Sequence, residues 1–433
     1  MPEDEGFSLT PAVAATDVNF FATEAGTDLF HYTGRLSVTD FDRMLAWAAL
    51  RRASDITVQS GQQIWAEIAG KWRRITRQPL TTDEVAECVR AMYGDNGPAI
   101  IKTGRDIDIP YEFRHPMRHP TTRVWEENYE AQPTRLRFRV NITGGRSPGG
   151  GDGMSCTLRA LPSQPVHIDK LEVEPEIMKY WRPEQGLNFV CGPTGSGKST
   201  LLSSLVRWRC EQKDANEKVV EFSSPIEFVY DDLDFPDSFV WQTGAGTHLI
   251  NPDERGEGGV WNYCIRNSLR RKPTTIILGE ARDRHTIEGC IQASLSGHLT
   301  ISTIHTIGVP ETFRRLVMPF PAGERATISV DLLQVLNIIV TQLLLPRLGG
   351  GKQAVREYLV FDGNVRVALE DQEANEWPRL LRKMLRIGKT DQGHPVIGQS
   401  MAVAARELVI RGRISEEAAR YVIQRTAIEE KGT

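Results

Sequence analysis

Residues 192–200 read Gly192-Pro193-Thr194-Gly195-Ser196-Gly197-Lys198-Ser199-Thr200, which matches the phosphate-binding pattern Gly-x-x-x-x-Gly-Lys-Ser in full. The apolar run 187–191 precedes it and predicts a buried strand, and residues 199–206 predict a helix. Strand, glycine-rich loop and helix N-terminus, in that order, are the context in which this pattern binds a nucleotide phosphate. The stretch therefore predicts a nucleotide-binding α/β domain.

Individual residues of this loop have separate expected roles. Gly195 and Gly197 would let backbone N–H groups turn inward around phosphate oxygens. Lys198 would contact the β- and γ-phosphates of ATP, and the Ser199 hydroxyl would ligate Mg²⁺.

Composition favours an ordinary globular protein of two or three domains. The chain has 433 residues, 40% hydrophobic and 25% charged, with a formal net charge of −4. Because no overall basic field is present, direct nucleic-acid binding is not expected. No signal peptide or transmembrane segment is predicted, and the six cysteines, none in a Cys-x-x-Cys pair, indicate reduced thiols of a cytoplasmic protein.

The pattern along the chain divides it into five segments. Residues 1–34 hold six acidic residues and no Lys or Arg, so an acidic flexible arm is expected there. Mixed helix and strand signals over 35–162 predict a small α+β domain, and 163–170 reads as a linker. Between 171 and 350 four short apolar strands alternate with helices, which predicts a parallel sheet, and a strand plus C-terminal helices are expected over 351–433.

Two carboxylates follow predicted strands of the parallel sheet. Glu280 ends the apolar run 275–279 and would lie beside the phosphate loop, where it could polarise a water or hold the hydration shell of Mg²⁺. Glu227 follows the strand 218–222 in Ser-Pro-Ile-Glu-Phe. Without the loop, Glu280 could equally be the cap of the next helix, and Glu227 is a second candidate carboxylate.

Histidines and arginines supply further candidates. His298 and His305 flank the predicted strand 299–303, and both are interpreted as strand-end groups of the active site. Arg270 and Arg282 add positive charge, as do Arg139 and Arg159 in the preceding domain, and an arginine often stabilises the transition state of phosphoryl transfer. A surface salt bridge remains the alternative interpretation of each arginine.

Four motifs together resemble the PilT-like secretion ATPase superfamily. These are its Walker A loop (192–200), its Asp box Pro-Ile-Glu-Phe-Val (225–229), its Walker B sequence Ile-Leu-Gly-Glu-Ala-Arg-Asp (277–283) and its His box (297–306). Within the superfamily, residues 224–231, 269–273 and 311–317 are most similar to the DotB/TraJ-type ATPases of type IVB secretion and conjugation systems.

The resemblance implies a RecA-like ATPase domain behind a smaller PAS-like N-terminal domain, which residues 53–58 and 137–141 resemble. It implies Glu280 as the catalytic carboxylate, Glu227 as the Asp-box glutamate, and His298 with His305 as the His-box pair. Arg139 and Arg159 match arginines that approach the nucleotide when the domains close. Relatives form hexameric rings that use ATP hydrolysis to move a membrane-embedded machine.

Departures from the family pattern leave alternatives open. Ser223-Ser224 stand where many relatives carry Glu-Asp, and residues 404–411 match the C-terminal motif of pilus retraction motors only loosely. The sequence favours a hexameric cytoplasmic ATPase, recruited peripherally to the inner membrane by components of a type IVB secretion or conjugation machine. A pilus retraction motor is the alternative within the family, and a nucleotide-binding scaffold subunit with little turnover is the alternative outside it.

Overall fold

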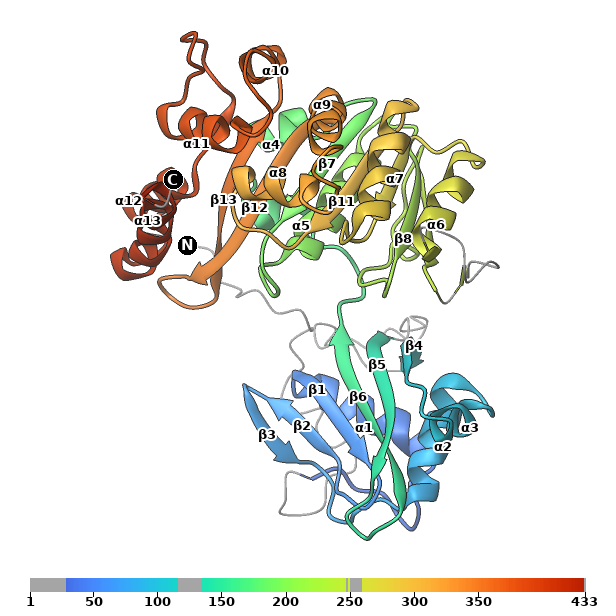
Figure 1. Cartoon of the computed structure of the whole chain (residues 1–433). Helices are drawn as coiled ribbons and strands as arrows, with labels where there is room; N and C mark the ends of the chain where they lie inside the picture. The colour runs from blue at the N-terminus through green and yellow to red at the C-terminus, as the bar shows by residue number, and fades with distance from the viewer. Residues whose placement is uncertain (1–28, 116–133, 247, 250–258, 432–433) are drawn as a thin grey trace. The chain divides into compact units, whose positions relative to one another are not determined.

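The computed structural model describes residues 29–115, 134–246, 248–249 and 259–431. The chain divides into two compact units, and the boundary along the sequence falls between Ser163 and Gln164 (Figure 1). Among the described residues, every helix is too short or too polar to cross a bilayer.

The N-terminal unit is an antiparallel sheet with helices on one face. Its six strands have the order β3-β2-β1-β6-β5-β4. In chain order these are β1 (Ala53–Gln59), β2 (Trp65–Ile68), β3 (Lys71–Arg74), β4 (Ile107–His115), β5 (Thr134–Arg146) and β6 (Asp152–Leu161). The helices are α1 (Val38–Leu50), α2 (Thr82–Tyr93) and α3 (Gly97–Lys102), and their apolar sides form one core with the sheet.

The first two helices of this unit each begin at a capping box that can be recognised in the sequence. Ser37 with Asp40 forms a capping box at α1, and Thr81 with Glu84 forms one at α2, so each satisfies N–H groups that a helix start leaves unpaired. The acidic arm expected over 1–34 lies mostly outside the described residues. Of its described part, Phe30 is buried in the core of this unit and donates its N–H to Ile75 O.

The second unit contains the predicted parallel sheet. Its eight strands have the order β14-β13-β12-β7-β11-β10-β8-β9. The six from β12 to β9 are parallel: β7 (Gly186–Cys191), β8 (Lys218–Ser223), β9 (Phe239–Gly244), β10 (Thr275–Leu278), β11 (Leu299–Ile304) and β12 (Leu336–Pro346). The expected α/β fold with a parallel sheet is confirmed.

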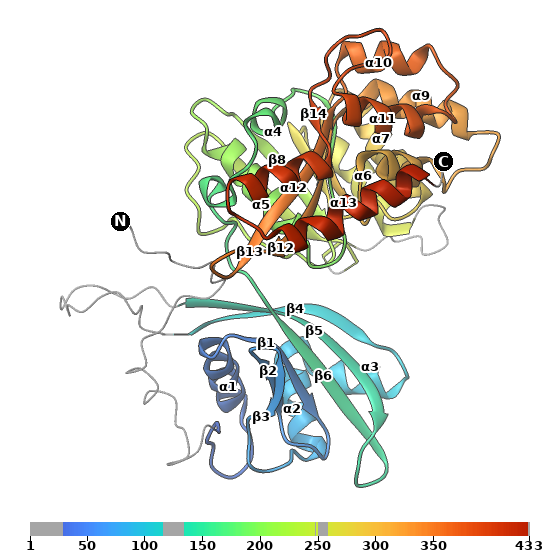
Figure 2. The ribbon, with the colours of Figure 1, turned by 90° about the vertical axis from the view of Figure 1, so that its left-hand side faces the viewer.

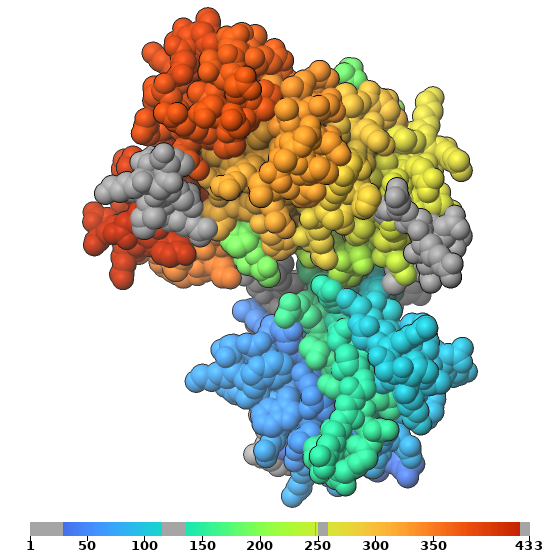
Figure 3. All heavy atoms as spheres, in the orientation of Figure 1, coloured from blue at the N-terminus to red at the C-terminus, as the bar shows by residue number. Residues whose placement is uncertain are grey.

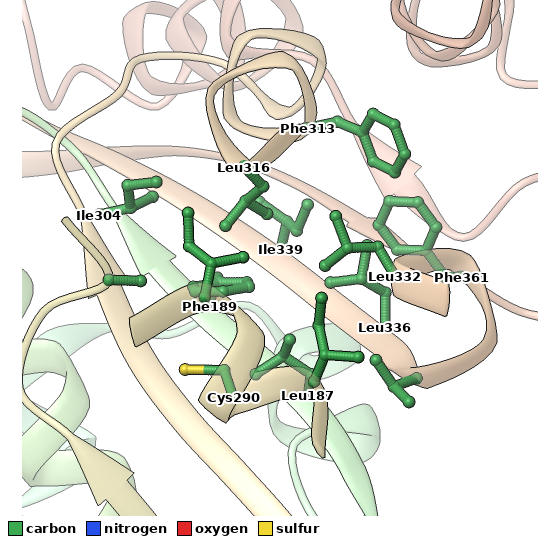
Figure 4. Packing of buried hydrophobic residues seen from close by; sticks show 14 of the residues in the cluster. Leu187, Phe189, Cys290, Ile304, Phe313, Leu316, Leu332, Leu336, Ile339 and Phe361 are labelled. Atoms are coloured by element: carbon green, nitrogen blue, oxygen red, sulfur yellow. The ribbon is translucent and has the colours of Figure 1, made fainter. Parts of the chain in front are cut away.

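Helices cover both faces of this sheet. On one face, α5 (Lys198–Glu211) and α4 (Pro175–Tyr180) pack with the short 3-10 helix η2 (Ile168–Leu171). On the other face lie α6 (Gly259–Leu269), α7 (Arg284–Leu295), α8 (Val309–Val317), α9 (Arg325–Val335), α10 (Gly363–Glu370) and α11 (Trp377–Ile387). In the space-filling view the atoms of α7 to α9, yellow to orange, cover that face (Figure 3). Figure 4 shows how Leu187 and Phe189 of β7 pack toward Leu316 and Leu336 beneath these helices.

The C-terminal region is continuous with the sheet. The strand β13 (Lys352–Val360) pairs antiparallel with β12 from Pro346–Lys352 to Ile338–Val360, and β14 (Gly398–Gln399) adds to its other side. The division expected at residue 350 therefore falls in the turn of a hairpin. Only α12 (Met401–Ile410) and α13 (Glu416–Lys431) form a small core apart from the two main ones, against β13 (Figure 2).

Candidate active site

The loop between β7 and α5 is shaped by close backbone packing. Gly192 has φ 151°, and a Cβ there would stand 2.4 Å from Gln342 O on β12. Gly197, with φ 77°, precedes α5 in the left-handed conformation, and its Cβ would stand 3.0 Å from the Gln342 side-chain nitrogen. Glycine is favoured at both positions because φ is positive, and at Gly192 a Cβ would also collide with the backbone of Gln342. As Gly197 offers no side chain to cap α5, the first N–H groups of the helix remain available to an anion.

The side chains of the loop fit a phosphate. Lys198 Nζ lies 3.0 Å from Pro193 O, so the ammonium group is folded over the loop. Burial lowers the pKa of Lys198, while the negative charges of Glu280 and Glu227 among its neighbours oppose that shift. Ser196 is 3% exposed, and its hydroxyl has no hydrogen-bond partner among the described residues. A buried cation and a buried, unpaired donor at a helix N-terminus form an anion site.

Glu280 is held at the carboxyl edge of the sheet by backbone bonds on both sides. Gly279 N donates to Phe222 O (2.8 Å), and Ala281 N donates to Thr303 O (2.9 Å). Arg282 Nε lies 2.7 Å from one Glu280 carboxylate oxygen, and His305 Nε2 lies 3.7 Å from the other. Glu280, Arg282 and His305 therefore form one charged cluster, and Glu280 also acts electrostatically on Lys198.

The segment that carries Glu227 is fixed by a buried polar network. Gln242 Nε2 on β9 donates to Phe228 O (2.7 Å) and to Glu221 (2.8 Å). The Ser223 hydroxyl donates to the other Glu221 oxygen (2.6 Å). At the position where relatives carry Glu, Ser223 thus orients a buried carboxylate two residues earlier on β8. Glu227 itself is exposed and close enough to Lys198 to affect its pKa.

Hard oxygen ligands suited to Mg²⁺ are available at this edge. Ser199 follows Lys198 in the first turn of α5, and the carboxylates of Glu280 and Glu227 act on that same lysine. A hydroxyl and carboxylates are the groups that Mg²⁺ prefers, usually together with water and substrate phosphate. Among the described residues, no group of three or more His, Cys, Asp or Glu side chains is placed to hold a metal ion.

Two predicted site residues, His298 and Arg270, lie at the edge of the sheet opposite Lys198. His298 precedes β11 and contacts the Ser296 hydroxyl (3.0 Å), whereas His305 follows the same strand. Six strand residues at about 3.3 Å each separate the two histidines by roughly 20 Å. Arg270 precedes β10 in the same way. Because parallel strands end at one edge, residues that precede a strand lie at the other, so within this chain neither residue is near Lys198.

The two candidate arginines of the N-terminal unit are neighbours. Arg139 and Arg159 are directly opposite each other on β5 and β6. Arg139 forms an ion pair with Asp108 (2.7 Å), and Arg159 forms one with Asp55 (2.9 Å). Both side chains are largely exposed, on the sheet face that the helices leave open.

Sequence reasoning gave no role to one residue in contact with the loop. Gln342 on β12 donates to Ser196 O (2.6 Å). The sequence offers one signal for this residue, because Gln342 is polar within the apolar run 332–345.

A depression of about 800 Å³ lies at the far end of α5, lined by Arg182, Trp208 and Arg209 among others. It is some ten helical residues, about 15 Å, from Lys198.

A phosphate loop at the carboxyl edge of a parallel sheet, beside a strand-end glutamate, is typical of a P-loop nucleoside triphosphatase. Residues 132–357 match the family described as Type II/IV secretion system protein, and the chain belongs to this family. The crystal structure of the Legionella pneumophila ATPase DotB is similar, with a TM-score of 0.76 and 36% identity over 92% of this chain and 98% of that one. The expected resemblance is thereby confirmed.

Pilus proteins are similar over almost the same length. A twitching motility protein of Neisseria gonorrhoeae is 28% identical, covering 86% of this chain and 89% of its own. The type IV pilus retraction ATPase PilT of Pseudomonas aeruginosa is 25% identical, covering 88% and 97%. The chain is therefore an ATPase homologous to both the DotB and the PilT groups.

The His305 environment predicts a shift that can be measured. Burial, followed by the charges of Lys198 and Arg282, lowers the pKa of His305 below 6.5, and Glu280 opposes this. We expect Arg282→Gln to raise the pKa of His305, because a nearby positive charge is removed, and Glu280→Gln to lower it further. NMR titration of ¹³C-labelled histidines, assigned with His305→Gln, measures both shifts. A pKa that is the same in all three proteins would show that these charges do not act on the imidazole.

Proposed function

We propose that this chain is the subunit of a hexameric motor that hydrolyses ATP to drive a secretion machine of the DotB type. The observation that carries the proposal is the arrangement at the carboxyl edge of the sheet. A buried lysine lies in the phosphate loop and interacts electrostatically with Glu280, which Arg282 and His305 contact.

The proposed chemistry begins with binding. The first N–H groups of α5 and the Lys198 ammonium hold the phosphate oxygens of ATP, and Lys198 exchanges its contact with Pro193 O for them. Ser199 would ligate Mg²⁺, and the ion would supply positive charge against the charge that develops on the transferred phosphate.

Glu280 then acts on the attacking water. Its carboxylate orients the water and accepts a proton as the water oxygen bonds to the γ-phosphorus and the bond to the β–γ bridging oxygen breaks. Arg282 contacts one carboxylate oxygen of Glu280, and His305 lies nearer the other. Burial lowers the pKa of His305, so its imidazole is mainly neutral near pH 7 and does not form a strong ion pair with Glu280.

Glu227 would act as a second carboxylate and hold the hydration shell of Mg²⁺. Two observations support this role: Glu227 acts electrostatically on Lys198, and Gln242 bonds the adjacent Phe228 O.

Glu280 and Lys198 have separable roles, which predicts separable defects. Glu280→Gln keeps the shape and removes the charge, so we expect ATP binding close to wild type and turnover lower by about 10²-fold or more. Lys198→Ala should lose nucleotide binding itself. Fluorescent-nucleotide titration and phosphate release measure the two quantities. A Glu280→Gln protein with wild-type turnover, beside an inactive Glu227→Gln protein, would reverse the assigned roles. Near-zero turnover by the assembled wild type would favour the scaffold alternative.

Assembly into a six-membered ring is part of the proposal, with Arg139 and Arg159 completing each site. We expect the double variant Arg139→Ala, Arg159→Ala to lose ATP turnover by a factor on the order of 10³, because each arginine would neutralise transition-state charge. Arg90→Ala on α2, an exposed arginine paired with Glu87, is the matched control and should leave turnover unchanged. Turnover measured over a dilution series, with light scattering for subunit number, tests the ring. Full activity of a monomer, or of the double variant, would contradict it.

The proposed client is a secretion or conjugation machine at the inner membrane. The chain would be cytoplasmic and reach the membrane by docking on a channel component. The 36% identity with DotB over nearly the whole chain favours this client. A pilus retraction motor is the second candidate, because the pilus relatives also match along most of their length.

A deletion strain separates the two clients. We expect loss of conjugation or effector delivery with normal pilus retraction, restored by the wild-type gene and not by the Glu280→Gln allele. Intact delivery with lost retraction would establish the second candidate instead.

A further inference from the structure

Arg356 on β13 is a buried cation outside the catalytic cluster. Its side chain is 2% exposed, and its guanidinium group makes four hydrogen bonds. Nε donates to Gln342 Oε1 (2.8 Å), and one terminal nitrogen donates to Leu171 O (2.9 Å). The other donates to Glu172 O (3.1 Å) and to the Glu174 carboxylate (3.1 Å). Burial of such a group is costly unless its donors are satisfied, so its geometry is tightly fixed.

Gln342 connects this guanidinium group to the phosphate loop. It lies directly opposite Arg356 in the β12–β13 ladder and is 4% exposed. Its Oε1 accepts from Arg356 while its Nε2 donates to Ser196 O at 2.6 Å. A glutamine amide can accept on one side and donate on the other, and this position uses both capacities.

At its other end, Arg356 holds the segment Leu171–Glu174. This segment follows Gln164, where the second unit begins, by only a few residues, and so it is the entry of the chain into the ATPase unit. Glu172 has a left-handed backbone, with φ 44°, and its carboxylate also accepts from Arg413 (2.9 Å). The Arg413–Glu172 ion pair is partly exposed and reaches the same segment without touching Gln342.

We propose that Gln342 and Arg356 are positioning residues that hold the phosphate loop and couple its occupancy to the placement of Leu171–Glu174. The chain of contacts runs from Ser196 O through both side chains to two backbone carbonyls and one carboxylate. Nucleotide bound on the loop restrains Ser196, which restrains Arg356 and the entry segment, and the reverse coupling has the same size. This inference rests on the proposed function, because it requires that nucleotide binds at the loop.

A single substitution separates this role from simple support of the fold. Gln342→Glu keeps an oxygen toward Arg356, now as a charged partner, and places a second oxygen against Ser196 O in place of the donor. We expect ADP affinity to fall about tenfold or more, because two acceptors then face each other in a buried place. The melting temperature of the apo protein checks that the variant folds, since the contact with Arg356 is kept.

Arg413→Met is the matched control. It removes an arginine from the same Glu172 and leaves the Gln342–Arg356 pair intact. Its ADP affinity should equal that of the wild type.

Hydrogen–deuterium exchange reads out the coupling itself in the full-length protein. With ADP and Mg²⁺, exchange of the amides over 168–176 should slow in the wild type and in Arg413→Met. In Gln342→Glu at saturating ADP, and in Arg356→Lys, this slowing should be lost.

Three outcomes would overturn the inference. They are unchanged ADP affinity in Gln342→Glu, equal weakening in Gln342→Glu and Arg413→Met, and nucleotide protection of 168–176 that persists in Gln342→Glu. A wild-type protein that binds no ADP would overturn the proposed function together with the inference.

Discussion

The phosphate loop depends on the close approach of two glycines to β12. At Gly192 and Gly197 the loop backbone lies so near Gln342 that a methyl group would collide with its carbonyl oxygen or its amide. This contact fixes the path of the chain from β7 into α5 and leaves the N–H groups of the helix start unpaired by side chains. The anion site therefore exists before any ligand arrives, and little reorganisation accompanies binding.

The same edge of the sheet explains the surroundings of the loop. Because β7, β8, β10 and β11 are parallel, the residues that follow them gather beside Lys198, and these include Glu227, Glu280 and His305. Arg282 and Glu280 neutralise one another in part, so a charged cluster is tolerated in a half-buried place. The Arg139 and Arg159 ion pairs of the N-terminal unit are exposed, and such pairs contribute only about 0–1 kcal/mol. Breaking these two ion pairs would therefore cost little free energy.

The sequence predicted the parallel sheet, the phosphate loop and the edge position of Glu280, because each depends on local pattern and on the strand that precedes it. His298 and Arg270 both precede their strands and so lie at the edge opposite Lys198, and their roles stay predictions. The pairing of β13 with β12 and the contacts of Gln342 and Arg356 could not be predicted, because they depend on register between strands. Glu221 and Ser223 are two residues apart on β8 and so share a face, but the contact of Glu221 with Gln242 could not be predicted, because it depends on the pairing of β8 with β9.

A crystal structure of the full-length protein with ADP and Mg²⁺ tests the central claim most directly. The account predicts the β-phosphate within hydrogen-bond distance of the amides of residues 195–199, Lys198 Nζ moved from Pro193 O to a phosphate oxygen, and the Ser199 hydroxyl on the metal ion. Nucleotide bound instead in the depression beside Arg182 and Trp208, with the loop empty, would contradict it.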